Sequence, residues 1–262
     1  MSTVAAGQDC LNCGEALRGE FCHACGQKAA AAHLGLHEVV HEAMHEFLHL
    51  DGKILTSLKV LVTRPGQLTT DLVAGRRATY VTPLRLYLTL SVLFFVLNAF
   101  VPNPTPGNFR ITMKDDSGQV ITNLTPEQQR RSDAIRASTI AAVPRLVFVL
   151  MPAFALLTLI FYRRTQPYFA AHLYYALHAH AFAFLVLAVL VLFRNLGTVV
   201  RGTADVLGAV WLVAYYYRSL QQVYAESWVK TIVKGTTIGV LYVAVIGMSL
   251  LALFNIIFAV VR

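Results

Sequence analysis

Residues 172–193 read HLYYALHAHAFAFLVLAVLVLF, an apolar run with no carboxylate, lysine or arginine. An α-helix needs about 20 apolar residues to cross the hydrocarbon core of a bilayer, and this run is long enough. Runs of similar length lie at residues 83–100, 143–162, 198–217 and 236–261. The sequence therefore predicts an all-α integral membrane protein whose main part is a bundle of about five transmembrane helices.

The overall composition also indicates a membrane protein. Of the 262 residues, 56% are hydrophobic and only 14% are charged, and the mean hydropathy is +0.56. Soluble domains usually carry about 25% charged residues, so a soluble globular protein is excluded. The formal net charge is +8, but the sequence has no run of lysine and arginine and no basic–aromatic interleaving. We therefore expect the lipid bilayer as a partner and no nucleic acid.

The run 198–217 is the least regular of the five, because it contains Arg201 and Asp205 near its start. Residues four apart lie on one face of a helix, so these two side chains can pair. Alternatively, Asp205 faces His178 or His180 in the run 172–193 and contributes to a proton or cation path. If the run does not cross the membrane, the bundle has four spans.

The basic residues next to the runs predict the orientation of the chain. With five spans, one side of the membrane receives Arg76, Arg77, Arg85, Arg163, Arg164, Arg218, Lys230 and Lys234. The positive-inside rule makes that side cytoplasmic, so we place the N-terminus in the cytoplasm and the C-terminus outside. The contrary observation is the segment 102–142, predicted as a polar extracytoplasmic loop, which carries basic residues of its own, mostly away from the spans.

All four cysteines lie within the first 25 residues, as Cys10 and Cys13 in CLNC and Cys22 and Cys25 in CHAC. Each pair is followed by a glycine, which permits the tight turn of a metal-binding knuckle. No apolar region of a signal peptide precedes them, and paired C-x-x-C motifs in an unexported segment indicate metal binding. Four thiolates close a tetrahedral site with no open position, so we expect one structural zinc per chain. A redox pair and a rubredoxin-like iron site are the alternatives.

The segment between the cysteines and the first span is predicted to be amphipathic. Apolar residues recur every three or four positions between residues 36 and 61, which is typical of a helix with one apolar face. The predicted organisation is a cytoplasmic zinc ribbon at 1–30, an interfacial helix and connector at 33–81, and the transmembrane bundle at 82–262.

Residues 37–49 read HEVVHEAMHEFLH and contain the pattern H-E-x-x-H of zinc proteases three times. His37, His41, His45 and His49 recur every four residues and form a stripe beside the apolar face. A catalytic zinc site needs one buried pair with oriented partners and a third ligand, so the regular stripe favours the polar edge of an interfacial helix. A non-catalytic site for Zn, Ni or Cu, and membrane docking that depends on pH, are the other interpretations.

The run 172–193 contains His172, His178 and His180. Ionisable groups inside a span are costly and mark functional sites. Because His178 and His180 are two residues apart, they point about 200° away from each other and do not easily hold one ion together. One interpretation is that one of them faces the interior of the bundle, where it binds a headgroup or a cofactor or forms part of a proton path. The simpler interpretation is a structural hydrogen bond to a neighbouring helix.

Two long segments resemble a known family: CLNCGEALRGEFCHACGQK (10–28) and FLHLDGKILTSLKVLVTRPGQLTTDLVAGRRATYVTPLRLYLTLSVLFF (47–95). They are similar to bacterial membrane proteins whose shared domain has no assigned function. The part 63–88, TRPGQLTTDLVAGRRATYVTPLRLYL, is the most distinctive, and HLYYALHAHAFAFL (172–185) extends the similarity. The resemblance implies a zinc ribbon, an amphipathic stretch and several spans in a bacterial inner membrane. It implies no activity.

The sequence contains no nucleophile elbow, P-loop or dinucleotide-binding motif. We therefore expect a membrane-embedded adaptor, or a carrier of a lipid or small molecule, with a structural zinc ribbon that engages a cytoplasmic protein. The alternative is a metal-dependent membrane enzyme, either a hydrolase or an oxidoreductase. Its site would use the histidines and glutamates of residues 37–49 or the histidines of the run 172–193.

Overall fold

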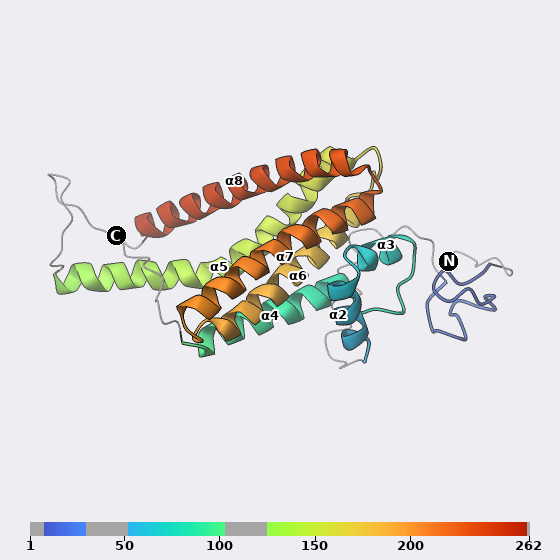
Figure 1. Ribbon diagram of the computed structural model, residues 1–262, viewed down its shortest axis with the longest axis horizontal. Coiled ribbons are helices and arrows are strands. Elements are labelled where there is room, and N and C mark those ends of the chain that lie inside the picture. Colours follow the sequence, from blue (N-terminus) through green and yellow to red (C-terminus); the bar gives the residue numbers. More distant parts are fainter. Residues whose placement is uncertain (1–7, 30–51, 103–124, 261–262) are drawn as a thin grey trace.

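The structure is a computed structural model that describes residues 8–29, 52–102 and 125–260. Within these ranges the chain forms a small cysteine-rich unit and seven helices. Two short helices, α2 (Lys53–Thr63) and α3 (Gln67–Val73), come first. Five long helices follow, and Figure 1 shows them side by side: α4 (Pro83–Phe100), α5 (Pro126–Tyr162), α6 (Phe169–Phe193), α7 (Thr198–Tyr224) and α8 (Trp228–Val260).

All five long helices are long and apolar enough to cross a membrane. They include α7, which carries Arg201 and Asp205 in its first turns. The predicted fold class is therefore confirmed, with five candidate spans rather than four. The predicted interfacial helix is seen only in its last part, as α2, because residues 30–51 lie outside the described ranges.

The helix ends follow from local signals in the sequence. Helix α4 has the predicted bounds, with Pro83 at its first position and Pro102 just beyond its end. Helix α5 differs, because it begins at Pro126, inside the segment predicted as a polar loop. Thr125 Oγ1 accepts from the Gln128 amide at 3.3 Å, and Gln128 Oε1 accepts from the Thr125 amide at 2.9 Å. This reciprocal capping box starts the helix before the apolar run begins.

Helix α6 occupies the interior of the bundle. It lies against α4, α5 and α7, and it buries Tyr175, Leu177, Ala181 and Phe182. The Phe182 ring stacks on Tyr215 of α7, with 3.5 Å between the ring centroids. Helix α8 lies at the outside, mainly against α5, and none of its apolar stretch is buried. The bundle is therefore built around α6.

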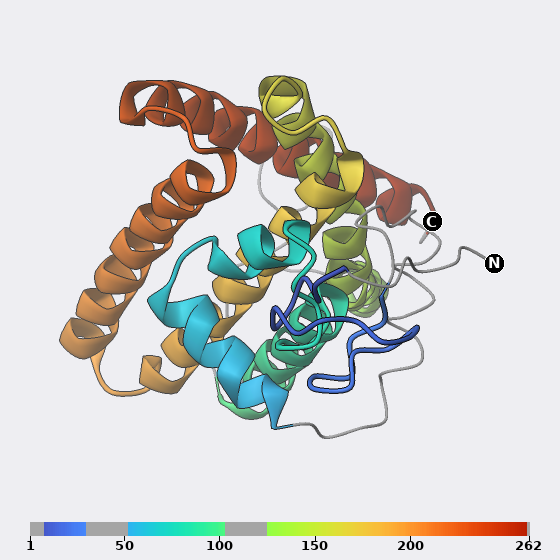
Figure 2. The same ribbon diagram turned by 90° about the vertical axis from the view of Figure 1, so that its right-hand side faces the viewer.

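The two ends of the bundle differ. The cysteine-rich unit, α2, α3 and the turn between α7 and α8 lie at one end, which we call the ribbon end (Figures 1 and 2). The C-terminus and the turn between α6 and α7 lie at the other end (Figure 1). This separation follows from the number of long helices. Because the chain passes along the bundle five times, the N-terminal unit and the end of α8 lie at opposite ends.

A tight turn places α3 against the ends of α6 and α7. The turn ends the predicted amphipathic helix at Arg64-Pro65-Gly66. Gly66 has a φ of 84°, and a Cβ atom there would lie 2.9 Å from the carbonyl oxygen of Ser219 in α7. Only glycine permits both this backbone conformation and this close approach.

Candidate metal centre

The four cysteines lie in two knuckles of the same design, in the unit 8–29 that we call the cysteine ribbon. In the first knuckle the Gly14 amide donates to the Cys10 carbonyl at 2.8 Å, and in the second the Gly26 amide donates to the Cys22 carbonyl at 2.8 Å. Gly14 and Gly26 have φ values of 78° and 72°. The C-x-x-C-G spacing thus produces two turns that each present two sulfur atoms.

The four sulfur atoms come together between the knuckles. All lie within 4.8 Å of one another, with Cys10 and Cys25 Sγ 3.6 Å apart and Cys13 and Cys22 Sγ 3.5 Å apart. A tetrahedron with metal–sulfur bonds of about 2.3 Å has edges of about 3.8 Å. The cysteines are free rather than joined in disulfides. The quartet therefore fits one four-coordinate metal ion.

The thiols of the quartet perturb one another. Backbone N–H donors, first that of Cys25, lower the pKa of Cys22 to about 7. The pKa of Cys13 is raised to about 12, because the lowering by the Glu15 amide is outweighed by the hydrogen bond to Cys22, by burial and by the other thiols. The backbone amides of the second knuckle thus favour the thiolate form of Cys22. A cation bound at the centre would instead stabilise all four thiolates.

The side chain of Gln27 attaches the cysteine ribbon to the connector between α3 and α4 (residues 74–82). Gln27 Nε2 donates to the Gly75 carbonyl at 2.8 Å. Gln27 Oε1 accepts from the amides of Arg77 at 2.9 Å and Ala78 at 3.1 Å. One amide group thereby satisfies three backbone groups of the connector. Because the Cys22 amide donates to the Gln27 carbonyl at 2.8 Å, the second knuckle positions this side chain.

Two further contacts join the ribbon and the connector. Thr79 Oγ1 donates to Asn12 Oδ1 at 2.9 Å. A Cβ atom on Gly75 would lie 2.7 Å from Leu11 Cδ1, so the first knuckle touches the backbone there. Asn12 lies between Cys10 and Cys13 of the first knuckle, and Gln27 follows Cys25 of the second knuckle. Both knuckles therefore hold the connector.

The connector is itself tied to the helices around it. The carboxylate of Asp71 accepts from Gln67 Nε2 at 2.8 Å and from the Tyr80 hydroxyl at 3.0 Å, and it forms an ion pair with Arg76 at 3.2 Å. Burial, together with the hydrogen bond to Asp71, raises the pKa of Tyr80. The Val81 amide donates to Ser57 Oγ of α2 at 3.0 Å. The ribbon is thus linked to the start of α4 through a segment that is hydrogen-bonded to α2 and α3.

The three histidines of α6 face three different neighbours. His172 Nδ1 lies 2.7 Å from the Tyr224 hydroxyl, and its Nε2 lies 2.9 Å from the Gln166 carbonyl. His178 Nδ1 lies 2.9 Å from Thr69 Oγ1 of α3. His180 Nε2 lies 2.8 Å from the Tyr242 hydroxyl of α8. These contacts join helices, as the simpler interpretation of the sequence requires.

Of the two other groups of predicted site residues, the structure describes one. Arg201 Nε lies 3.8 Å from Asp205 Oδ2 across one turn of α7, and both side chains are partly exposed. The pair lies near the start of α7 at the end away from the ribbon (Figure 1). The histidines His37, His41, His45 and His49 lie outside the described residues. In the part of the chain that the structure describes, the cysteine quartet is the one group of three or more metal-ligating side chains that lie close together.

Several residues with a role in these contacts were not found by sequence reasoning. Gln27, Thr69 and Tyr242 each pair with a residue between 48 and 109 positions away. A lone glutamine, threonine or tyrosine has no spacing pattern that would reveal such a partner. The repeated C-x-x-C-G-E/Q pattern was the one available signal, because it places Gln27 directly after a knuckle.

Comparison with known protein families finds one that matches part of the chain. Residues 51–95 match the family described as "Protein of unknown function (DUF3667)". No curated protein and no solved structure matches the chain. The matched segment contains α2, α3, the connector and most of α4. The similarity to an uncharacterised domain family therefore covers the surface on which the cysteine ribbon lies.

Proposed function

We propose that this protein is a membrane-embedded adaptor whose cysteine ribbon holds one structural zinc ion and displays a docking surface on the cytoplasmic face. The observation that carries the proposal is the attachment of the ribbon through Gln27. Through Gln27, the ribbon bonds to three backbone groups beside α4. A module whose fold depends on a metal is thereby connected to the membrane bundle.

The features of the ribbon support binding rather than catalysis. Four sulfur ligands leave no open position for a substrate or a reactive water. Binding energy from the metal would fold a unit of 22 described residues whose buried core is Cys10, Leu17 and Cys22. Phe21 is 59% exposed on this unit, and an exposed aromatic side chain is a common anchor for a protein partner.

The enzyme alternative receives less support from the described residues. The histidines of α6 are directed at separate partners and are used in contacts between helices. A catalytic metal centre needs several ligands directed at one point. The remaining candidates for such a centre are the histidines and glutamates of residues 37–49.

The first experiment measures metal content and ribbon attachment on the same preparations. We expect elemental mass spectrometry of the detergent-purified, tag-free protein to find one zinc per chain. The variant Cys10→Ser/Cys13→Ser should lose it, and His41→Ala/His45→Ala should keep it. Iron in place of zinc would contradict the zinc site. A second tightly bound metal that is lost only from the histidine variant would favour the enzyme.

Hydrogen exchange then tests whether the metal holds the ribbon on the connector. The Arg77 and Ala78 amides should be protected in the zinc-loaded protein, because both donate to Gln27 Oε1. Chelation and Gln27→Ala should each expose them, whereas Gln8→Ala, at an exposed ribbon position, should not. Unchanged protection after chelation would overturn the coupling between metal and membrane bundle.

A further inference from the structure

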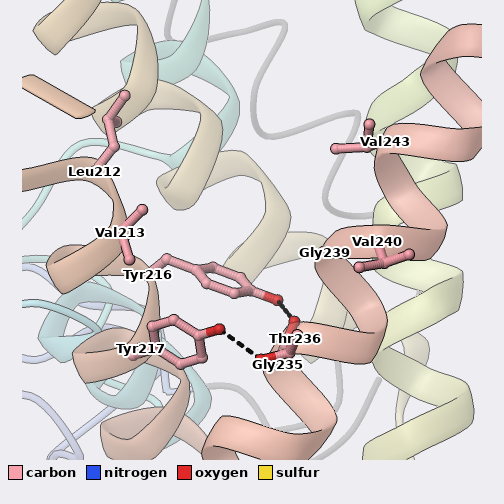
Figure 3. A pocket seen from close by; sticks show the side chains of 9 residues that line it. All are labelled: Leu212, Val213, Tyr216, Tyr217, Gly235, Thr236, Gly239, Val240 and Val243. Carbon is pink, nitrogen blue, oxygen red and sulfur yellow. Dashed lines mark hydrogen bonds between the residues drawn. The ribbon is translucent and has the colours of Figure 1, made fainter. Parts of the chain in front are cut away.

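Many polar groups inside the bundle pair with one another. In the apolar groove between α7 and α8, the Tyr216 hydroxyl donates to the Gly235 carbonyl at 2.9 Å, and the Tyr217 hydroxyl lies 2.8 Å from Thr236 Oγ1 (Figure 3). Both tyrosines thus satisfy their hydroxyl groups within the protein. A buried polar group without such a partner is an exception that points to a ligand, because the loss of its hydration is not compensated.

Arg85, in the first turn of α4, is such an exception. It is only 6% exposed, and among the residues that the structure describes its guanidinium has no hydrogen bond, ion pair or aromatic ring contact. Two residues further on, Tyr87 is buried against Phe148 and Phe184, so this part of α4 belongs to the packed bundle. A buried positive charge without an anion beside it is strongly destabilising.

The surroundings of this turn carry an excess of positive charge. The acidic side chains Asp71 and Glu226 lie near the ribbon end, and each has a cation of its own: Asp71 pairs with Arg76 at 3.2 Å and Glu226 with Lys234 at 2.6 Å. The segment 64–85 contains four arginines and one aspartate, a net charge of +3 (four minus one). This excess attracts anions to the start of α4.

The same turn presents further donors without partners. Thr82, the residue before the helix, makes no capping hydrogen bond with its side chain, and its Oγ1 is buried without a partner. Pro83 has no amide N–H, and the amides of Leu84 and Arg85 lie in the first turn, where the helix itself offers no carbonyl to accept from them. The first turn also contains no acidic residue, so the positive end of the helix dipole is uncompensated there.

These donors lie on one side of the first turn. Thr82 and Arg85 are three residues apart, which makes them neighbours on the helix surface. Side chains of a helix lean toward its N-terminus, so the Arg85 side chain extends over the turn that begins at Thr82. Thr82 and Leu84 are partly exposed, and the turn can therefore be reached from the surface.

We propose that the first turn of α4 binds a phosphate group, held by the Arg85 guanidinium, the Thr82 hydroxyl and the backbone amides of Leu84 and Arg85. A guanidinium binds phosphate through two parallel hydrogen bonds, and the N-terminus of a helix is a common phosphate site. The group belongs either to a lipid headgroup at the ribbon end or to free phosphate. The site involves neither the metal nor a partner of the ribbon, so it does not rest on the adaptor function.

Thermal unfolding of the delipidated full chain, in a detergent and buffer free of phosphate, tests the site. The probes are inorganic phosphate and phosphatidylglycerol, which carry the same group on different molecules. We expect at least one of them to raise the unfolding midpoint by about 5 °C at a concentration about 100-fold above its Kd. No response to either probe would overturn the proposal.

Arg85→Met should remove this response, because it weakens binding about tenfold or more. Without phosphate, the same variant should be at least as stable as the unchanged protein, since it removes a buried charge that has no partner. An arginine with a purely structural role predicts the opposite sign. A lower midpoint of Arg85→Met in the absence of phosphate would therefore contradict the site.

Thr82→Val provides a second test that leaves the charge in place. It should weaken phosphate binding about threefold, since it removes one neutral donor. Arg163→Met is the matched control, because Arg163 is exposed at the end of α5, and it should keep the full response. An equal loss in Arg163→Met and Arg85→Met would mean that anions bind through general positive charge, which would overturn the site.

The source of the phosphate group is decided by comparing the two probes with diacylglycerol, which has the acyl chains but no phosphate. A response to phosphatidylglycerol without one to inorganic phosphate or diacylglycerol assigns the site to a lipid headgroup. A response to inorganic phosphate alone assigns it to the free ion. Equal responses to phosphatidylglycerol and diacylglycerol, with none to inorganic phosphate, would show that the acyl chains bind and would overturn the phosphate site.

Discussion

Helices α6 and α8 have the same mean hydropathy in their most apolar segments, yet half of that segment is buried in α6 and none in α8. Apolarity shows that both helices belong in a bilayer, but it does not show where in the bundle each one lies. The polar residues make that distinction. Helix α6 carries three histidines that contact neighbouring helices, whereas much of α8 presents aliphatic side chains to its surroundings.

The reason lies in how helices associate in a membrane. Lipid tails are as apolar as leucine, so burial of apolar surface does not by itself draw helices together. Close packing and hydrogen bonds between helices decide which surface turns inward. A span with polar groups along it finds partners inside the bundle, and a span without them is equally stable at the edge.

The largest difference between the two helices should come from truncating a leucine. Leu177 of α6 is 3% exposed and Leu251 of α8 is 65% exposed. Leu177→Ala should lower the free energy of unfolding by about 2–5 kcal/mol, because it leaves a cavity among fixed neighbours. Leu251→Ala should change it by no more than about 0.5 kcal/mol. Unfolding of both variants in the same detergent provides the measurement; equal losses would contradict the inner and outer assignment.

A smaller difference is expected for polar residues. His172→Leu should lower the free energy of unfolding by about 1–3 kcal/mol, since it leaves the Gln166 carbonyl and the Tyr224 hydroxyl without this buried partner. Asn255 in α8 has an exposed side chain that donates to the Leu251 carbonyl of its own helix. Asn255→Leu should be neutral or slightly stabilising. Thermal denaturation would show whether His172→Leu lowers the stability while Asn255→Leu does not.

The smallest effect concerns the contact that joins the two helices. A double-mutant cycle with His180→Phe and Tyr242→Phe should give a coupling free energy of about 0.6 kcal/mol, typical of hydrogen bonds between membrane helices. The two atoms are 2.8 Å apart. Additive effects of the two substitutions would mean that this hydrogen bond does not hold α8 on α6.

The sequence determined the elements more closely than their arrangement. Pro83 and Pro102 mark the ends of α4 unambiguously, and the cysteine spacing alone places four sulfur atoms around one point. The start of α5 was available in the letters TPEQ at residues 125–128, because threonine three residues before glutamine is a capping box. The long polar segment around these letters concealed it.

The arrangement depends on pairs that no local pattern connects. Gln27 lies 48 residues before Gly75, and Tyr217 lies 19 residues before Thr236. In each case the partner is a backbone group or a common hydroxyl that many other residues also offer. Only the three-dimensional packing of the helices selects one of them.

The length of α5 has a further consequence. Its 37 residues rise about 55 Å, against a hydrocarbon thickness of about 30 Å. Even at a tilt of about 40°, such a helix covers roughly 42 Å along the bilayer normal. A helix of this length is therefore longer than the hydrocarbon core, and the polar first turns of α5 lie at the end of the bundle opposite the ribbon (Figure 1). The end of α8 accompanies it, with the Arg131 guanidinium 5.0 Å from the centre of the Phe258 ring. The five-helix bundle thus carries a compact cysteine ribbon at one end and a projecting helix at the other.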